Sequence, residues 1–380
     1  MQTNRFETFM DAVLAIIITV LVLKIPQPDN PTWNAILKLN IRYISYFICY
    51  VIIFNIWFNN HNLFQMVEEI DNSVVVVNGI LLFVISLIPY FATWLSLNPQ
   101  SIPAEVMFGL LFILANIFYI LATYLVVRAN PYNEKLKKTN LMSINVYIPL
   151  IVICIGYLFT FTLYTPGVFV ACVLSALCWF IFAVKGQFEI ESSERFEALI
   201  DAIVAIILTI IVLEIPMAVN GSWEALFDIK IEFIAYAISF IVCFNFWNYN
   251  HNLFSIVNKI NSKVIWSLGA SMFVLSVIPY LTIFVAENFY SFVPQACYGI
   301  DFIIIALISI VTSNALKDAD KGNVALLMAL RKNSHYISTL IIVAVGMIIG
   351  YFVYPPAVII SCLLSIIWIW IYNYIRLTFN

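Results

Sequence analysis

Residues 5–24 read RFETFMDAVLAIIITVLVLK, and residues 195–214 read RFEALIDAIVAIILTIIVLE. Each stretch opens with an arginine, carries an aspartate six residues later, and is then almost entirely apolar. A helix of this length rises about 30 Å, which is the thickness of the hydrocarbon core of a bilayer. Both stretches therefore predict a membrane-spanning helix, and their likeness predicts an internal duplication.

A shift of 190 residues aligns the two halves of the chain without an insertion. The aligned pairs include Asp11 with Asp201, Trp57 with Trp247, His61 with His251, Pro89 with Pro279, and Pro166 with Pro356. We therefore predict two tandem repeats, residues 1–190 and 191–380. If each repeat has six helices, both enter the membrane from the same side and are parallel rather than inverted.

The composition is that of a protein solvated by lipid. Of the 380 residues 63% are apolar and only 10% are charged, and the mean hydropathy is +0.99. Spanning runs are predicted near residues 6–24, 42–64, 74–95, 104–128, 145–163 and 165–184, and again 190 residues later. The predicted fold is an all-α integral membrane protein of 12 transmembrane helices, and we expect the lipid bilayer rather than nucleic acid as its surroundings.

The distribution of basic residues predicts the topology. If the N-terminus is cytoplasmic, 14 of the 18 lysines and arginines fall on the cytoplasmic side, so both termini are expected there. The first run resembles a signal peptide, but its internal copy argues for a retained helix. Richness in Ile, Asn, Lys and Tyr favours a prokaryotic plasma membrane over a lysosome. The seven cysteines have no ligand-like spacing, so we expect no metal and no cofactor.

Polar residues near the predicted cytoplasmic ends form a candidate helix clamp. An aspartate within a membrane helix costs about 2.5–3.5 kcal/mol, so its presence in both repeats needs a reason. Asp11 and His61 are expected at matching depth on antiparallel helices. The predicted clamp comprises Arg5, Asp11, His61 and Asn62, with Arg195, Asp201, His251 and Asn252 in the second repeat. It could fix helix orientation, sense protons during gating, or belong to a proton relay.

One face of the first helix offers a candidate permeation surface. Its members are spaced by four, three and four residues, which places them on one side of a helix. They are Ala12, Ile16, Thr19 and Leu23, with Ala202, Ile206, Thr209 and Leu213 in the second repeat. Around an axis, isoleucines could form a hydrophobic gate and threonine hydroxyls could replace ion hydration. The alternative is a helix-packing stripe whose threonines bond to their own backbone.

The motif Arg5-x-x-x-Phe9-Met10-Asp11, repeated as Arg195-x-x-x-Leu199-Ile200-Asp201, resembles a known family signature. It is similar to the Arg-x-x-x-Phe-Ser-Asp sequence that opens the first helix in the transmembrane protein 175 family of potassium channels. The resemblance implies a homodimer that conducts potassium ions. It further implies a constriction at Ile16 and Ile206, a hydroxyl layer at Thr19 and Thr209, and motif residues that hold the pore helices. The serine is absent from both copies, and the phenylalanine from the second.

The alternatives to a channel are a secondary transporter and a lipid-embedded enzyme or scaffold. A secondary transporter also fits two parallel six-helix halves, and Asp301 would be its membrane-embedded charge. A lipid-embedded enzyme or scaffold ranks last, because no nucleophile–base pair, phosphate loop or metal motif occurs at usable spacing. We therefore expect a channel that is not an enzyme.

Overall fold

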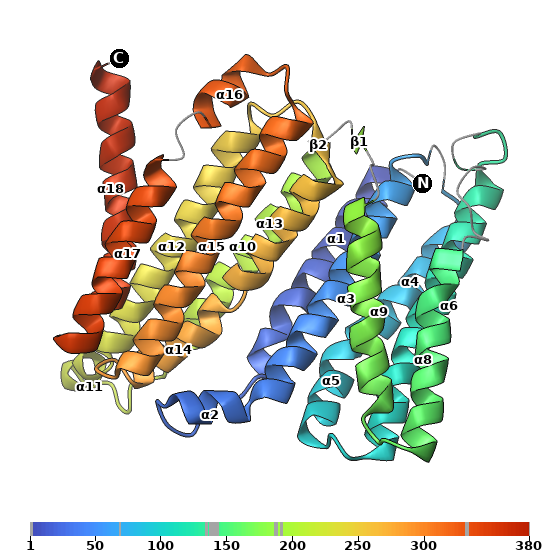
Figure 1. Ribbon diagram of the computed structural model, residues 1–380, viewed down its shortest axis with the longest axis horizontal. Helices are drawn as coiled ribbons and strands as arrows, with labels where there is room; N and C mark the ends of the chain where they lie inside the picture. Colours follow the sequence, from blue (N-terminus) through green and yellow to red (C-terminus); the bar gives the residue numbers. More distant parts are fainter. Residues whose placement is uncertain are drawn as a thin grey trace. The chain divides into compact units, whose positions relative to one another are not determined.

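The structure is a computed structural model that describes residues 3–67, 70–133, 136, 144–185, 189–190, 193–330 and 334–379. The described part of the chain is all-α apart from one very short ladder (Figure 1). The first half contains α1 (Thr3–Val20), η1 (Val22–Lys24), α2 (Trp33–Lys38), α3 (Asn40–Phe64), α4 (Asn72–Ser86), α5 (Ile88–Leu97), α6 (Ile102–Ala129), α8 (Ile144–Thr162) and α9 (Gly167–Lys185).

The second half repeats this order of helices. It contains β1 (Glu189–Ile190), α10 (Glu194–Leu213), α11 (Trp223–Asp228), α12 (Lys230–Phe254), β2 (Ile260–Asn261), α13 (Ser262–Leu275), α14 (Ile278–Glu287), α15 (Phe292–Ala319), α16 (Val324–Leu330), α17 (Ser334–Phe352) and α18 (Ala357–Phe379). Five helices, α2, α3, α5, α6 and α8, have both ends displaced by 190 residues in α11, α12, α14, α15 and α17. The two halves of the sequence thus encode the same local structure.

Equivalent helices also begin in the same way. Thr32 caps α2 by accepting a hydrogen bond from Ala35 N, and Ser222 caps α11 from the equivalent position. Asp71 caps α4, where its counterpart Asn261 caps α13. Each of these side-chain oxygens satisfies a backbone N–H that the first turn of a helix leaves open. A proline near the start of α5 and of α14 separates each from the helix before it.

Among the described residues, eight helical segments are long and apolar enough to cross a membrane. They are Arg5–Lys24, Asn40–Phe64, Asn72–Leu97, Ile102–Ala129, Glu194–Leu213, Lys230–Phe254, Ser262–Glu287 and Phe292–Ala319. Four shorter apolar segments lie in α8, α9, α17 and α18. The protein is therefore an all-α, multi-pass membrane protein.

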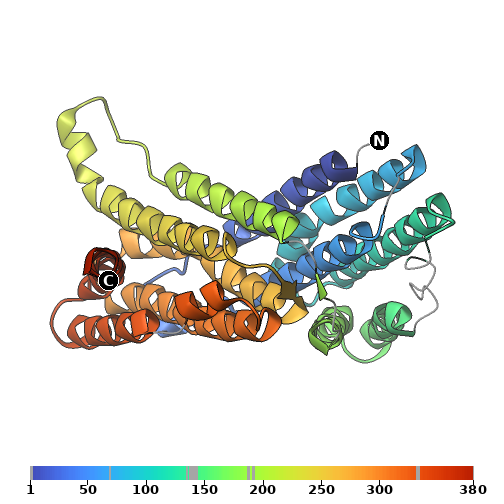
Figure 2. The ribbon, with the colours of Figure 1, turned by 90° about the horizontal axis from the view of Figure 1, so that it is seen from above.

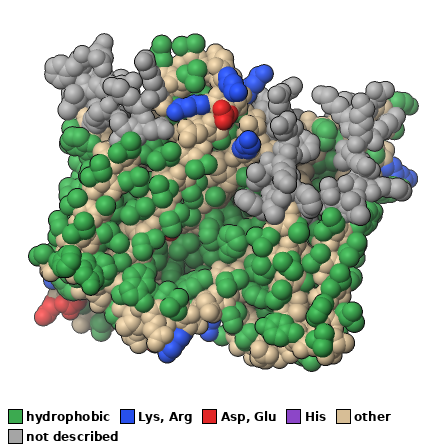
Figure 3. Space-filling view, viewed as in Figure 1, with side chains coloured by type: hydrophobic (Ala, Val, Ile, Leu, Met, Phe, Trp, Pro, Cys, Tyr) green, Lys and Arg blue, Asp and Glu red, His purple; other side chains and the backbone are tan. Residues whose placement is uncertain are grey.

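The surface agrees with this assignment. Figure 3 shows a face that is covered by hydrophobic side chains over most of its height, with Lys, Arg, Asp and Glu near its upper and lower edges. Exposed large apolar residues recur along the apolar helices, for example Phe83, Leu158, Ile341 and Ile348. A soluble monomer rarely exposes apolar patches of this extent, whereas lipid chains solvate them at no cost.

The last two helices of each half pack closely through glycine. A Cβ added at Gly156 of α8 would lie 2.5 Å from Ala171 Cβ of α9, and Gly346 meets Ser361 at the equivalent α17–α18 contact. Gly109 of α6 likewise leaves room for Val168 of α9, and Gly299 of α15 leaves room for Val358 of α18. Small residues let membrane helices approach until their backbones nearly touch.

The chain divides into two compact units whose boundary does not follow the chain order. Unit 1 consists of Met1–Ile25 and Asn40–Gln187, and unit 2 of Pro26–Leu39 and Phe188–Asn380. The connection that contains α2 thus packs with unit 2, although it joins α1 to α3. In unit 2, β1 and β2 form an antiparallel ladder with Glu189 opposite Asn261. The predicted boundary at residue 190 separates two similar stretches of sequence rather than two compact units. It stays a prediction.

Candidate functional site

The predicted permeation face of α1 is mostly exposed in the chain. Ala12 and Leu23 are exposed, and 49% of the Ile16 side chain is accessible although it is a large apolar group at mid-helix. Thr19 differs, because it is fully buried. The opposite side of α1 supplies buried core residues such as Leu14 and Ile18. The helix is thus anchored on one side and leaves an apolar stripe open on the other.

The equivalent face of α10 is more evenly exposed. Ala202 and Ile206 are half-buried, whereas Thr209 and Leu213 are exposed. The buried side of this helix contains Ile203 and Ile207, among other apolar residues. Figures 1 and 2 show α10 running beside α12 within unit 2. The two equivalent helices therefore turn the same predicted stripe away from their own units, with Thr19 as the exception.

The two predicted threonine positions satisfy their hydroxyl protons locally. Thr19 Oγ1 donates to the carbonyl oxygens of Ala15 and Ile16, at 2.9 and 3.0 Å. Thr209 Oγ1 donates to Ile206 O at 2.8 Å. A hydroxyl that donates to its own helix still has lone pairs that can accept or coordinate. Thr209 is exposed, so its hydroxyl oxygen is accessible from outside the chain.

A tryptophan connects the clamp residues of the first repeat. Trp57 Nε1 of α3 donates to Asp11 Oδ1 of α1 at 2.8 Å, and both side chains are buried. The indole of Trp57 stacks on the His61 ring, with centroids 5.0 Å apart and planes 15° from parallel. On its other side, His61 Nε2 lies 2.7 Å from Gln65 Nε2. The aspartate and the histidine are therefore brought together through the tryptophan that lies between them.

The second repeat builds the same cluster in a more open setting. Trp247 Nε1 donates to Asp201 Oδ1 at 2.7 Å, and the indole stacks on His251 with centroids 5.0 Å apart and planes at 14°. Here Asp201 and His251 are exposed, whereas Asp11 and His61 are buried. We call the two sets the Asp–Trp–His clusters. Each ties the first helix of its repeat to the second.

The arginines and asparagines of the predicted clamp differ in exposure. Arg5 is exposed at the start of α1, and Arg195 is half-buried at the start of α10. Asn62 is half-buried, while Asn252 is exposed and donates to Asn248 O at 2.7 Å. The structure thus joins the predicted Asp and His residues, and it places the asparagines toward other surroundings. What any of these residues does in function stays a prediction.

The cluster tryptophans are the members that sequence reasoning missed. Trp57 and Trp247 were visible only as matched positions of the repeat. Their spacing of four residues from His61 and His251 was the available signal, because residues at i and i+4 share a helix face. An indole also supplies the single donor that an aspartate within a membrane helix needs.

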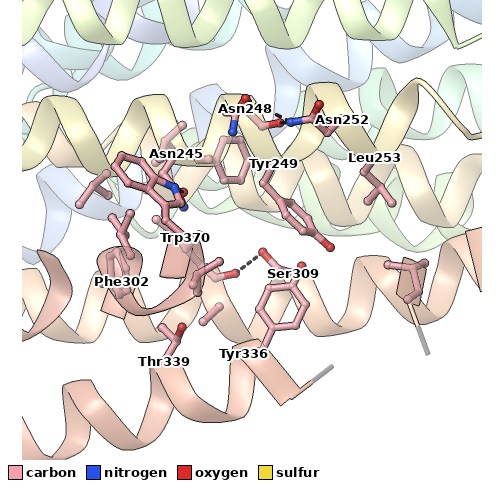
Figure 4. A pocket seen from close by; sticks show the side chains of 18 of the residues that line it. Asn245, Asn248, Tyr249, Asn252, Leu253, Phe302, Ser309, Tyr336, Thr339 and Trp370 are labelled. Atoms are coloured by element: carbon pink, nitrogen blue, oxygen red, sulfur yellow. Dashed lines mark hydrogen bonds between the residues drawn. The ribbon is translucent and has the colours of Figure 1, made fainter. Parts of the chain in front are cut away.

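Unit 2 also contains a cavity of about 310 Å³ that is lined by apolar and uncharged polar side chains, mainly of α12, α15, α17 and α18. Figure 4 shows Asn245, Tyr249, Ser309, Tyr336 and Trp370 around it, and Trp370 Nε1 donates to Asn245 Oδ1 at 2.9 Å. Asn252 is the only predicted site residue in its lining, which contains no charged side chain among the described residues. The cavity therefore offers no ion pair of the kind a coupled transporter uses.

No metal centre emerges from the described residues. Among them, no three His, Cys, Asp or Glu side chains gather as a metal site would require. The candidate site therefore consists of the two exposed first-helix stripes and the two Asp–Trp–His clusters behind them.

Comparison with protein families places both stripes within a known pattern. The family described as "Endosomal/lysosomal potassium channel TMEM175" matches residues 5–89 and 195–279. Each match begins at the motif arginine and ends at the proline that starts α5 or α14. It includes the first helix, the aspartate, the tryptophan and the histidine of each repeat.

Curated relatives agree with the family match. A potassium channel of Chryseobacterium sp. (strain P1-3) is 33% identical over 182 residues, which cover 48% of this chain and 94% of that protein. A potassium channel of Chamaesiphon minutus is 30% identical over 31% of this chain and 63% of its own length. The endosomal/lysosomal proton channel TMEM175 of Danio rerio is 23% identical over 68% of this chain and 59% of its own length.

Replacing Trp57 by phenylalanine should destabilise the protein. The change keeps the ring stacked on His61 but removes the donor to the buried Asp11, at a cost of about 1–3 kcal/mol. Trp247→Phe should cost less, because water can reach the exposed Asp201. Thermal unfolding of the purified protein in detergent measures both. The control is Trp368→Phe, whose indole is exposed and makes no hydrogen bond to a described residue. Equal melting temperatures for Trp57→Phe and the control would remove the structural role.

Proposed function

This chain belongs to the TMEM175 family of ion channels, and from this premise we propose that it is a potassium-permeable channel. In this proposal, two copies of the chain surround one central pore, which the first helix of each repeat lines. The observation that carries the proposal is the apolar stripe of α1 with its half-exposed Ile16, repeated on α10. The same helices open both regions matched by the family.

The proposed membrane arrangement has twelve spanning helices. Eight segments meet the length of a full span, and the apolar parts of α8, α9, α17 and α18 supply four more. The repeats are then parallel, with both termini on the cytoplasmic side. We place the protein in a prokaryotic plasma membrane, which is consistent with the bacterial relatives.

The size of the relatives supports two copies. The Chryseobacterium channel aligns almost entirely with a stretch the length of one repeat. A pore shared by identical single-repeat chains needs several copies, and a chain with two repeats needs half as many. With two copies, four first helices surround the axis, and the passage is completed only on assembly.

Each part of the stripe has a physical task in this proposal. Ile16 and Ile206 form an apolar ring that is narrow enough to lose its water in the closed state. Thr209, and Thr19 to a lesser degree, offer hydroxyl oxygens that replace part of the hydration shell of an ion. Ala12 and Ala202 widen the cytoplasmic side, and Leu23 and Leu213 border the outer side. Such a pathway needs no bound cofactor, because the permeant ion passes down its gradient.

The Asp–Trp–His clusters hold the pore helices in this orientation. The bond between Trp57 and Asp11 fixes the rotation of α1 on α3, and the bond between Trp247 and Asp201 does so for α10 on α12. A rotation of α1 that moved Ile16 off the axis would break this bond. The clusters are therefore positioned to couple any movement of the second helix to the constriction.

Flux through reconstituted liposomes tests the ion and the transport mode. With a potassium gradient, a channel should give passive flux that does not saturate at carrier rates. Flux that requires a counter-ion would favour the secondary transporter instead. The vertebrate relative is named a proton channel, so proton flux measured on the same vesicles decides between potassium and protons as the permeant ion.

Substitution of both constriction residues should raise the basal flux. Ile16→Asn with Ile206→Asn places amides in the ring, so water and ions wet it more readily. If the free-energy barrier to permeation falls by about 1.4 kcal/mol, the flux increases about tenfold. The control is Ile341→Asn, because Ile341 is also an exposed isoleucine but lies on α17, outside the stripe. Basal flux that is unchanged in the double variant would exclude both residues from the pore.

Removal of the exposed hydroxyl should weaken selectivity for potassium over sodium. Thr209→Val keeps the shape of the side chain and deletes the oxygen, and a loss of about 1 kcal/mol would lower the selectivity ratio about fivefold. Thr19→Val should change it less, because Thr19 is buried and donates to two carbonyls. Thr209→Ser serves as the control that retains the hydroxyl. Reversal potentials under bi-ionic conditions measure the ratio, and equal values for Val and Ser would contradict the assignment.

A further inference from the structure

The connection between α1 and α3 acts as a clasp within unit 2. Residues 26–39 pack with that unit, and two hydrogen bonds fix them to the start of α14. Gln27 Nε2 donates to Tyr280 O at 3.0 Å, and Tyr280 Oη donates to Pro26 O at 3.2 Å. Tyr280 is consequently only 5% exposed.

The equivalent connection of the second repeat is largely exposed. It joins α10 to α12 and contains α11, and Figure 2 shows it projecting from the rest of unit 2. Its side chains include Met217, which is 91% exposed, and Val219, which is 95% exposed. Trp223 and Phe227 are exposed as well. Apolar groups at this density outside the spanning segments mark an interaction surface.

The equivalent receiving surface of unit 1 is open as well. Tyr90 occupies the position of Tyr280 but is 66% exposed. Beside it, an open groove of about 550 Å³ runs between α1 and α5. Its lining is mainly apolar. On the α1 side it runs from Ile16 to Lys24, the one charged member among the described residues, and on the α5 side it includes Trp94 and Leu97. Unit 1 therefore presents a vacant counterpart of the surface that the clasp covers in unit 2.

We propose that residues 214–229 of one copy dock on the α1–α5 groove of unit 1 in a second copy of this chain. The proposal rests on the homodimer of the proposed function and names the surface that joins the two copies. The clasp in unit 2 is the template: Tyr90 Oη donates to Pro216 O of the partner, as Tyr280 donates to Pro26. Met217 occupies the position equivalent to Gln27. The contact between copies therefore has one hydrogen bond fewer than the clasp in unit 2, and it buries more apolar area.

Charge and symmetry support the same occupant. Lys24 of the groove and Glu214 at the base of the connection are equivalent positions with opposite charge, and both are exposed. Opposite charges steer and align two surfaces even where they add little affinity. Each repeat of the sequence offers one connection and one receiving surface, so the contact is heterologous and must close into a ring. Two copies provide four units, and the two intermolecular contacts satisfy both open surfaces.

Crosslinking between introduced cysteines tests the contact in membranes. The full-length variant Tyr90→Cys with Met217→Cys is treated with a short bifunctional thiol reagent, in a background where Cys154, Cys178 and Cys297 are alanine. These are the native cysteines that are not buried. We expect a product of twice the chain mass on a reducing gel. The matched control is Gln27→Cys with Tyr280→Cys, which should crosslink within one chain and keep the single-chain mass.

Coexpression of two single-cysteine variants tests whether the crosslink joins two different chains. Chains that carry only Tyr90→Cys, coexpressed with chains that carry only Met217→Cys, should also give the double-mass product. Either variant expressed alone should give much less. A Tyr90–Met217 product of single-chain mass would show that the connection folds back on its own unit 1, which overturns the proposal. So would no product at all while the control pair reacts, because the connection would then face lipid or water.

The outcome is separable from that of the proposed function. Potassium flux is measured on the full-length protein without the introduced cysteines. Flux without the Tyr90–Met217 crosslink overturns the docking surface and leaves the channel intact. A crosslinked dimer without flux supports the docking surface and contradicts the channel.

Discussion

The structure depends on how an aspartate is accommodated inside a membrane helix. Such a side chain needs hydrogen-bond donors, and a neighbouring helix can supply one. In both repeats that donor is an indole N–H on the second helix, 2.8 Å away in one and 2.7 Å in the other. We interpret this directional bond as one that fixes the rotation of the first helix and so turns its isoleucine stripe away from its own unit. The candidate pathway follows from that rotation.

Duplication gave the two repeats equal helices but different surroundings. Asp11 and His61 are buried, and their counterparts Asp201 and His251 are exposed. Tyr280 lies beneath the connection of the first repeat, whereas Tyr90 is open. Where the surroundings differ, the sequence differs too: Gln27 corresponds to Met217, and Lys24 corresponds to Glu214. The two repeats therefore have unlike surfaces at equivalent positions.

Sequence reasoning predicted the all-α, multi-pass character of the chain because it depends on local composition. Eight of the twelve predicted apolar runs appear, among the described residues, as helical segments long enough to span a membrane, and the other four lie in shorter apolar helices. It missed α2, α11 and α16, whose few residues carry little periodicity. It also missed Trp57 as the partner of Asp11. The clamp was predicted by matching polar side chains at equal depth in the membrane, and a tryptophan, whose ring is largely apolar, is not counted among them. The different exposures of Tyr90 and Tyr280 could not be predicted, since packing rather than residue type determines them.

The central claim is that the stripes of α1 and α10 face one shared passage. Single-particle imaging of the protein in lipid nanodiscs tests it most directly. The account predicts two copies around an axis, with Ile16 and Ile206 pointing at it and each Asp–Trp bond behind them. A particle with these stripes packed against neighbouring helices, or with lipid filling the axis, would contradict it.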